Sequence, residues 1–428
     1  MHTLLFYQPG HFHAALTLRR PNPRVAPDVH VYAPPGSDRD GFLALVQAFN
    51  DRADDPTHWR VHLHDRGDNL LAQLIADQLG DAVILAGKND CKIDAIAALH
   101  AAGLHVLADK PWAVSAAAIR PLTTITAGGA LALDIMTERH DVIARLRHRL
   151  VTDPELFGSF REGPEAAIEL ASVHHLLKVV NGSPLRRPEW YYDVRVQGDG
   201  LVDVQSHLTD QSQWLLETET PYDYERDVQL LGARGWHTEI PLELYQRSTG
   251  RADFHPELEP SVVNGVLHYG CNGVIDYRLR GVLVRQTAEW RPVEPEGGGD
   301  LHHTVIRGTR ADVVVRQGPE TGFKAEIHLR PIDAAAGPTL AAQLEARIEA
   351  WQADFPGLGV RPSDLGLQLD PPDDIRTPHE AHFAMVLESF LDYLDAGAWP
   401  SSLTPEIRTR YTLLAHAHQL ARQEQDRA

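Results

Sequence analysis

A carboxylate and an imidazole, Asp203 and His207, stand four residues apart in a run that has helical spacing. Because residues four apart on a helix lie on one face, the two side chains are within reach of each other. A carboxylate that binds one imidazole nitrogen fixes the tautomer and makes the other nitrogen more basic. The pair suits a general base that takes a proton from an alcohol, although most helical pairs of this kind are solvated or capping pairs.

A cation, Lys110, stands between a short apolar run and Pro111, which restricts the backbone before it. Most lysines in such places lie on the surface. A crevice between two domains would instead bring this cation together with His207, and so combine a base with a group that stabilises negative charge. Lys110, Asp203 and His207 are therefore our candidate catalytic residues.

The segment before Lys110 explains how that lysine could be positioned. Two short apolar runs, 83–86 and 104–108, are typical of parallel strands that helices bury on both faces, and an interval with helical spacing separates them. A right-handed crossover places both strand ends at one edge of the sheet, where ligands bind in such folds. We expect residues 87–89 and 109–111 to face a shared crevice.

Strands and helices alternate through the first part of the chain, which predicts a Rossmann-type, doubly wound parallel sheet. We assign residues 1–137 to this dinucleotide-binding domain. Besides the two runs above, strands are predicted at 4–7, 29–33, 60–64 and 130–135.

Residues 138–428 have a different texture and predict an α+β domain for substrate binding and oligomerisation, with a mostly antiparallel sheet covered by helices. Short helices are expected at 172–178 and 198–214, and a hairpin connection at 297–300. Strands are expected at 227–231, 262–269, 274–283, 304–307, 312–316 and 325–329, and covering helices at 340–351, 378–396 and 406–422.

Gly10 is the one glycine in the turn after the first predicted strand, where His11, Phe12 and His13 fill the following positions. A dinucleotide fingerprint has three glycines there, which let the backbone approach a pyrophosphate. The turn alone is therefore a weak sign of a nucleotide site.

The second predicted strand ends in residues 32–34, none of which is the acidic residue that usually binds the ribose hydroxyls. Arg39 is a candidate partner for a 2′-phosphate, and Asp38 or Asp40 for the ribose. The choice between NAD and NADP stays open, with NAD slightly favoured.

The overall charge argues against nucleic acid as a partner, because 40 basic and 59 acidic residues give a formal net charge of −19. The two cysteines, Cys91 and Cys271, form no disulfide framework or metal-ligand pattern, which fits a reducing cytoplasm. We find no leader pattern and no run of about 18 apolar residues, so we expect neither export nor a membrane span.

His174 and His175 are candidate pocket residues, and as helical neighbours they would point about 100° apart. A metal site made from them with His11 or His13 has no third ligand fixed by spacing, so we assign no metal. Trp190 and the two tyrosines after it could stack on a sugar ring, but we expect at least two of these three rings to pack in a core or an interface.

Two of these motifs resemble one known family. Ala108-Asp-Lys-Pro111 resembles the Glu-Lys-Pro signature of the glucose–fructose oxidoreductase and inositol dehydrogenase family, Gfo/Idh/MocA, with Asp in place of Glu. The run 198–210 resembles its glycine-led Asp-x-x-x-His helix, and 137–139 and 305–310 also match in place. The resemblance covers nearly the whole chain and points to a branch with a distinct C-terminal domain. Proteins of this branch also start with Pro-Gly-His-Phe-His-Ala, as residues 9–14 do here. The glycine-poor turn is the main departure.

The resemblance implies a role for each matching residue. Lys110 would contact both the nicotinamide ribose and the substrate hydroxyl, and His207 would be the general base, oriented by Asp203. The implied contacts with NAD or NADP are Gly10, His11, Phe12, Gly87, Asn89, Asp109, Lys110 and Glu138. The implied contacts with substrate are Lys110, Arg139, His174, His175, Trp190 and His207.

The activity that these roles imply is hydride transfer between the nicotinamide and a sugar, cyclitol or related polyol. An alternative is a glycoside-cleaving enzyme that oxidises the sugar transiently and regenerates its own NAD. A further alternative, which the turn suggests, is a dinucleotide-binding sensor without catalysis. The family also implies a homodimer or larger assembly, formed through the open sheet of the second domain.

Overall fold

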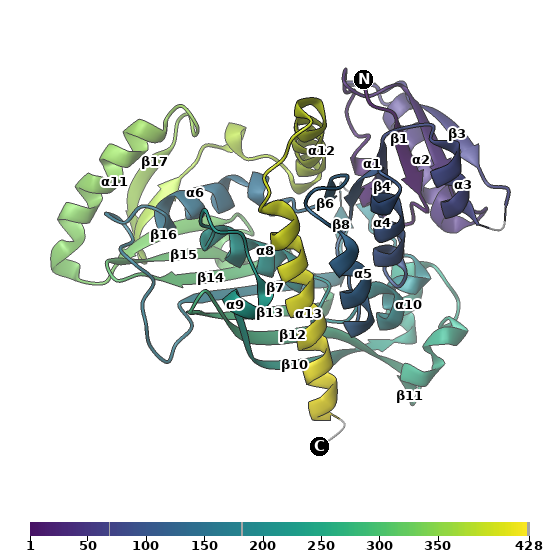
Figure 1. The fold of residues 1–428 in the computed structure, drawn as a ribbon. Helices are drawn as coiled ribbons and strands as arrows, with labels where there is room; N and C mark the ends of the chain where they lie inside the picture. The colour runs from purple at the N-terminus through teal and green to yellow at the C-terminus, as the bar shows by residue number, and fades with distance from the viewer. Residues whose placement is uncertain (68, 181–182, 426–428) are drawn as a thin grey trace.

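The computed structural model describes residues 1–67, 69–180 and 183–425, and these form two large sheets that lie side by side (Figure 1). A six-stranded parallel sheet occupies the N-terminal part, and a ten-stranded, mostly antiparallel sheet occupies the rest. Both sheets match the predicted classes. Within the described ranges, no helix is both long and apolar enough to cross a membrane.

The parallel sheet has the strand order β3-β2-β1-β4-β5-β6, so the order reverses between β1 and β4. Its strands are β1 (Leu4–Tyr7), β2 (Asp28–Tyr32), β3 (Arg60–His64), β4 (Ala82–Leu85), β5 (His105–Ala108) and β6 (Ala132–Asp134). All four residues of β4 are buried, as expected for a strand between two helical layers. The crevice at this reversal is where a doubly wound fold binds its ligand.

Short helices connect these strands. They are α1 (His13–Leu16), α2 (Ser37–Asp51), α3 (Leu70–Asp77), α4 (Lys92–Ala101) and α5 (Ile119–Thr124), with a 3₁₀ turn η1 (Ala116–Ala118) before α5. The helix α1 is a single turn.

The larger sheet runs in the order β10-β12-β13-β7-β14-β15-β16-β18-β17, with β11 beside β12. Its strands are β7 (Ile168–Leu177), β10 (Val228–Pro241), β11 (Val262–Val263), β12 (Val266–Leu279), β13 (Val282–Val293), β14 (Leu301–Arg307), β15 (Ala311–Gln317), β16 (Glu326–Pro331), β17 (Gly359–Ser363) and β18 (Gly366–Asp370). Neighbours are antiparallel except β13 and β7, which are parallel. A separate two-stranded sheet pairs β8 (Val179–Val180) with β9 (Ser183–Pro184).

Four predictions in this sheet are wrong. The predicted strand 262–269 is β11, a turn at Asn264 and Gly265, and the start of β12. Residues 172–178 fall largely in strand β7, because pairing with β13 on one side and β14 on the other outweighs the local helical pattern. The predicted strand 274–283 is the end of β12, a turn at Arg280 and Gly281, and the start of β13. The connection at 297–300 is not a hairpin, because β7 lies between the two strands that it joins.

The remaining helices are α6 (Val142–Val151), α7 (Val194–Gln197), α8 (Gln205–Leu215), α9 (Tyr224–Asp227), α10 (Leu242–Thr249), α11 (Gly337–Trp351), α12 (His379–Ala396) and α13 (Leu403–Gln425). The prediction that 378–396 covers the second sheet is wrong. Phe383, Leu387 and Phe390 of α12 pack in the core of the parallel sheet instead, beside β1 and β2.

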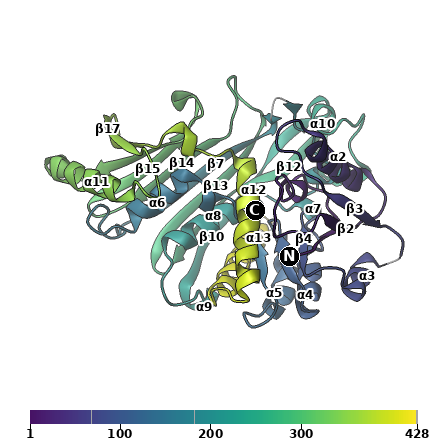
Figure 2. The same ribbon diagram turned by 90° about the horizontal axis from the view of Figure 1, so that it is seen from above.

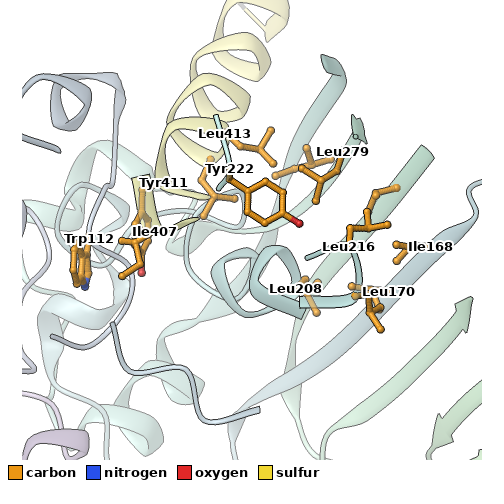
Figure 3. Close-up of a cluster of buried hydrophobic side chains, with 14 of the residues drawn as sticks. Trp112, Ile168, Leu170, Leu208, Leu216, Tyr222, Leu279, Ile407, Tyr411 and Leu413 are labelled. Carbon is orange, nitrogen blue, oxygen red and sulfur yellow. The ribbon is translucent and has the colours of Figure 1, made fainter. Parts of the chain in front are cut away.

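The helix α13 runs along the boundary between the two sheets in both views (Figures 1 and 2). Trp112, just after β5, stacks on Tyr411 of α13 with ring centroids 5.5 Å apart, and Figure 3 shows both rings in the core at this boundary. Arg410, which is only 1% exposed, forms ion pairs with Asp134 of β6 and Asp210 of α8. The ion pairs of Arg410 link the two domains and hold β6 of the parallel sheet next to α8.

Candidate active site

A cavity of about 910 Å³ lies between the two domains. The parallel sheet contributes residues that follow β4 and β5, including Gly87 and Lys110, while α6, β7 and α8 contribute residues from the other side. Lys110 and His207 both line this cavity. The structure therefore brings together the cation and the imidazole that the sequence placed in different domains.

Lys110 is held by an ion pair with Asp203, whose Oδ1 lies 2.6 Å from Nζ. Both side chains are largely buried, at 12% and 6% exposure. The expected orientation of His207 by Asp203 is therefore not what the structure contains. Asp203 lies in the turn before α8, which begins at Gln205, so the helical four-residue spacing does not apply to this pair.

His207 lies in the first turn of α8 and presents an imidazole to the cavity. Its Nδ1 is buried and has no hydrogen-bond partner. Burial, and then the charge of Lys110, hold the pKa of His207 well below its usual value. The side chain is therefore neutral near pH 7 and is able to accept a proton.

Asp109 lines the larger cavity and contacts two histidines of the turn after β1. Nδ1 of His13 and Nδ1 of His11 lie 2.9 and 3.2 Å from its Oδ2. Burial alone would raise the pKa of Asp109, but the two imidazoles hold it well below its usual value. Burial lowers the pKa of His13 to about 3. The carboxylate thus fixes both histidines of the turn.

The turn itself differs from a glycine-rich phosphate cradle. The amides of Gly10 and His11 both donate to the carbonyl of Ala86, at 2.9 and 3.0 Å. A Cβ on Gly87 would lie 2.3 Å from the Gln8 carbonyl, so the loops after β1 and β4 are in close contact. Donors to a pyrophosphate here would have to come from side chains instead of these two amides.

A second cavity of about 540 Å³ adjoins the turn on the side of β2. Gly10 and Asp38 line it from the first domain, and Arg186 lines it from the second. His11 and Phe12 line both cavities. The two cavities therefore follow one another along the carboxyl edge of the sheet, as the two halves of a dinucleotide do.

Asn89 is only 3% exposed, and its polar groups are already in use. Its Nδ2 donates to the carbonyl of Gln197 at 2.8 Å, and its Oδ1 accepts from Lys92. Its amide donates to the carbonyl of Val196 at 3.1 Å. Asn89 therefore joins the two domains in this structure.

Glu138 and Arg139 are neighbours in the 3₁₀ turn η2 (Glu138–His140) and point to different places. Glu138 lines the larger cavity, and burial, followed by the charge of Asp141, raises its pKa to about 7. Arg139 is absent from the described lining and binds Asp210 and Glu406 instead. The expected substrate contact of Arg139 is replaced by a place in the ion-pair network of α13.

His174 and His175 lie in β7, so their positions do not follow the helical geometry expected for them. His174 lines the cavity and its Nδ1 lies 3.0 Å from Oδ2 of Asp300. His175 is 1% exposed and has Asp300 Oδ1 at 3.5 Å from its Nδ1. Lys178 also pairs with Asp300, at 3.0 Å. Asp300, which follows the glycine run 297–299, is thus the common partner of the two histidines and the lysine.

Trp190 lines the larger cavity, and its indole Nε1 donates to Asp38 of the first domain at 3.0 Å. Tyr191 and Tyr192 are 3% and 1% exposed and pack in an aromatic core with Tyr245 and Tyr269. The expectation that two of the three rings are core residues is confirmed.

Sequence reasoning missed Arg147 and Asp300 as cavity residues. Arg147 lines the cavity from α6, on the same helix face as the buried Ile143 and Leu150. A charged residue on the apolar face of an amphipathic helix was the signal available in the sequence. Asp300 carried no comparable signal, because its importance depends on β7 separating β13 from β14.

A doubly wound sheet joined to an open-sheet domain, with a cavity between them, fits the class of nicotinamide-dependent oxidoreductases. Comparison with known proteins agrees. The family model described as "Putative oxidoreductase C terminal domain" matches residues 146–422. No curated protein gives a significant match.

Solved structures with this fold include a putative oxidoreductase from Parabacteroides merdae, which is 37% identical, with a TM-score of 0.94 over 99% of this chain and 98% of its own. A levoglucosan dehydrogenase in complex with NADH and levoglucosan is 12% identical, with a TM-score of 0.62 over 99% and 97%. A putative myo-inositol dehydrogenase from Sinorhizobium meliloti is 14% identical, with a TM-score of 0.55 over 99% and 98%. The last two likenesses concern the fold alone.

The chain belongs to the Gfo/Idh/MocA family, in the branch that carries this C-terminal domain. It is an NAD(P)-dependent oxidoreductase of that family.

Proposed function

We propose that this oxidoreductase transfers a hydride between a hydroxyl-bearing carbon of a sugar, cyclitol or related polyol and a nicotinamide, with His207 as the general base. The observation that carries the proposal is the shared cavity of Lys110 and His207, in which Asp203 fixes the lysine at 2.6 Å. Two structural neighbours, a levoglucosan dehydrogenase and a putative myo-inositol dehydrogenase, support the substrate class.

The residues present fit a nicotinamide dinucleotide along the sheet edge. Gly87 and Lys110 would hold its nicotinamide half, and the side of the turn with Gly10 and Asp38 its adenosine half. Asp38, in the first turn of α2, lines the smaller cavity and would bind the ribose hydroxyls, which favours NAD over NADP. Arg39 supports the same preference, because it already pairs with Asp65 at 3.1 Å. The cofactor supplies the hydride acceptor or donor.

The remaining chemistry belongs to this chain. His207 is neutral because burial and Lys110 disfavour its charged form, so an imidazole nitrogen is free to take the hydroxyl proton. The ammonium of Lys110 stabilises the negative charge that develops on the substrate oxygen as the proton leaves. Asp203 keeps that ammonium in place and thereby acts as a positioning residue. The buried wall with His174 and Trp190 would hold the sugar ring.

Reduction of NAD⁺ during incubation with a panel of aldoses, uronates and inositols tests this function, together with NADH binding by fluorescence. We expect His207→Ala to lower kcat by about 100-fold or more while NADH still binds. His237→Ala is the matched control, because His237 is exposed on β10, away from the cavity. Unchanged turnover in His207→Ala would contradict the assignment. Cleavage of a glycoside without net reduction of NAD⁺ would favour the redox-neutral alternative.

A further inference from the structure

One basic side chain of the larger cavity has, among the described residues, neither an ion pair nor a hydrogen-bond partner for two of its donors. Of the cations that line it within the described ranges, Lys110 pairs with Asp203 and Lys178 pairs with Asp300. Arg187 donates to two backbone carbonyls, at 3.0 Å each. Arg147 is 4% exposed, and its Nε and Nη2 have no hydrogen-bond partner.

A buried guanidinium with two unused donors is costly, because it cannot lose its proton to become neutral. The acidic groups that act on Arg147 are Glu138, Asp141 and Asp210. Asp141 caps α6 through the amides of Ile143 and Ala144, and Asp210 is held by Arg139 and Arg410. Glu138 forms no ion pair with Arg147 within 4.0 Å in the described part of the chain. The fold thus leaves this cation unpaired.

We propose that Arg147 binds an anionic group of the substrate, so that the enzyme acts on an acidic polyol that carries a carboxylate or a phosphate. The proposal deepens the polyol oxidoreductase function and rests on it for the polyol scaffold. Nε and Nη2 lie on one edge of the guanidinium, which matches two oxygens of either group.

The position of Arg147 fits a subsite one helical turn from the reacting centre. Gln211 follows His207 by four residues on α8, and both line the cavity, so they share one face of that helix. The helix α6 packs against α8 and presents Arg147 to the same cavity, one turn after Ile143. A substrate with its hydroxyl at His207 could therefore extend its acidic group past Gln211 toward Arg147.

Calorimetric titration of the purified full chain tests the proposal, with D-glucuronate, D-glucose 6-phosphate and D-glucose as probes and no added cofactor. We expect at least one anionic probe to bind roughly tenfold or more tightly than D-glucose. Arg147→Met should remove that advantage and leave D-glucose affinity within about twofold, while Arg147→Lys should keep part of it. Whether the uronate or the phosphate shows the advantage identifies the acidic group.

Arg149→Met is the matched control, because Arg149 lies on the same helix with an exposed ion pair to Asp354 and should bind all probes as wild type does. Equal affinity of wild type for all three probes, or an equal loss for D-glucose in Arg147→Met, would overturn the proposal. Turnover plays no part in this measurement, so a failure of the hydride-transfer function and a failure of the anion subsite remain distinguishable.

The melting temperature of the apo protein gives a second test. A purely structural role of Arg147 would make Arg147→Met melt lower than wild type, whereas the proposal predicts the opposite. Arg147→Met should melt higher than wild type, because it removes a buried charge that lacks a partner. Inorganic phosphate or D-glucuronate should raise the melting temperature of wild type more than that of the variant. A lower melting temperature for Arg147→Met together with unchanged probe affinity would show a structural role and contradict the proposal.

Discussion

Lys110 and Asp203 form an ion pair of 2.6 Å across the boundary between the two domains. The lysine follows β5 of the parallel sheet, and the aspartate precedes α8 over the larger sheet. One contact therefore both links the domains and fixes the cation of the candidate active site. His207, our proposed general base, forms no ion pair with a carboxylate in the described ranges, and burial and the charge of Lys110 favour its neutral form.

This ion pair predicts separable effects on stability and catalysis. Asp203→Asn should lower the free energy of unfolding by about 3 kcal/mol, because it leaves a largely buried ammonium without a counter-charge. The double variant Lys110→Met with Asp203→Leu should recover most of that stability but no activity, since the cation is lost. Urea unfolding and steady-state kinetics on the same preparations measure both. Independent, additive effects of the two substitutions on stability would contradict a direct pairing.

Arg410 should be among the most sensitive positions of the chain. Arg410→Met removes the partner of Asp134 and Asp210, which are 4% and 1% exposed. Breaking a buried ionic network in this way costs about 3–5 kcal/mol. Arg422→Met, on the exposed end of the same helix, is the control and should be close to neutral. Chemical denaturation decides the question, and a loss below about 1 kcal/mol for Arg410→Met would count against the network.

Glu138 predicts how binding depends on pH. Its pKa is raised to about 7, so it is neutral in mildly acidic solution and charged in mildly alkaline solution. Above that pH its charge attracts Arg147 and repels an acidic ligand in the same cavity, which should weaken the binding of D-glucuronate. Asp141 and Asp210 also face Glu138, and the pKa of Asp210 is lowered, so that carboxylate stays charged throughout.

Titrations of D-glucuronate between about pH 6 and pH 8 measure this dependence. Glu138→Gln should bind the probe with an affinity that changes little over the same interval. A wild-type affinity that is flat, or that rises with pH, would contradict the assignment of Glu138.

Protonation of His207 should not limit turnover between about pH 6 and pH 8. Its pKa lies well below the usual value, so protonation should slow alcohol oxidation only in distinctly acidic solution. The pH profile of kcat for oxidation measures this, with Glu138→Gln as the background that removes the other titration. A fall in kcat from pH 8 to pH 6 in that background would show a more basic His207 than the structure indicates.

The parallel sheet could be predicted from the sequence because its strands are buried on both faces. Runs such as 83–86 are apolar throughout and end in polar tips, so both the strand and the direction of its carboxyl end are readable. Lys110 could be placed for the same reason, since it stands two positions after the end of such a run. Local patterns were sufficient wherever one short segment determines the outcome.

The rest depends on contacts between distant segments. The partner of Asp203 is 93 residues away, and the nearby histidine at helical spacing was the misleading local alternative. His174 lies in a strand because β13 and β14 pair with it from both sides, and that pairing also places Asp300 beside it. Arg147 was visible as a charge on an apolar face, but its lack of a partner becomes clear only when the facing helices are in place.

The most direct test of hydride transfer at this site follows an isotope. Wild type, His207→Ala and Lys110→Met are incubated with NAD⁺ and a mixture of carbon-deuterated glucose, glucuronate, glucose 6-phosphate and myo-inositol, and the nicotinamide is analysed by mass spectrometry. We predict deuterium on the reduced nicotinamide from wild type and little or none from either variant. Equal deuterium incorporation by wild type and His207→Ala, or reduced nicotinamide without deuterium, would contradict the account.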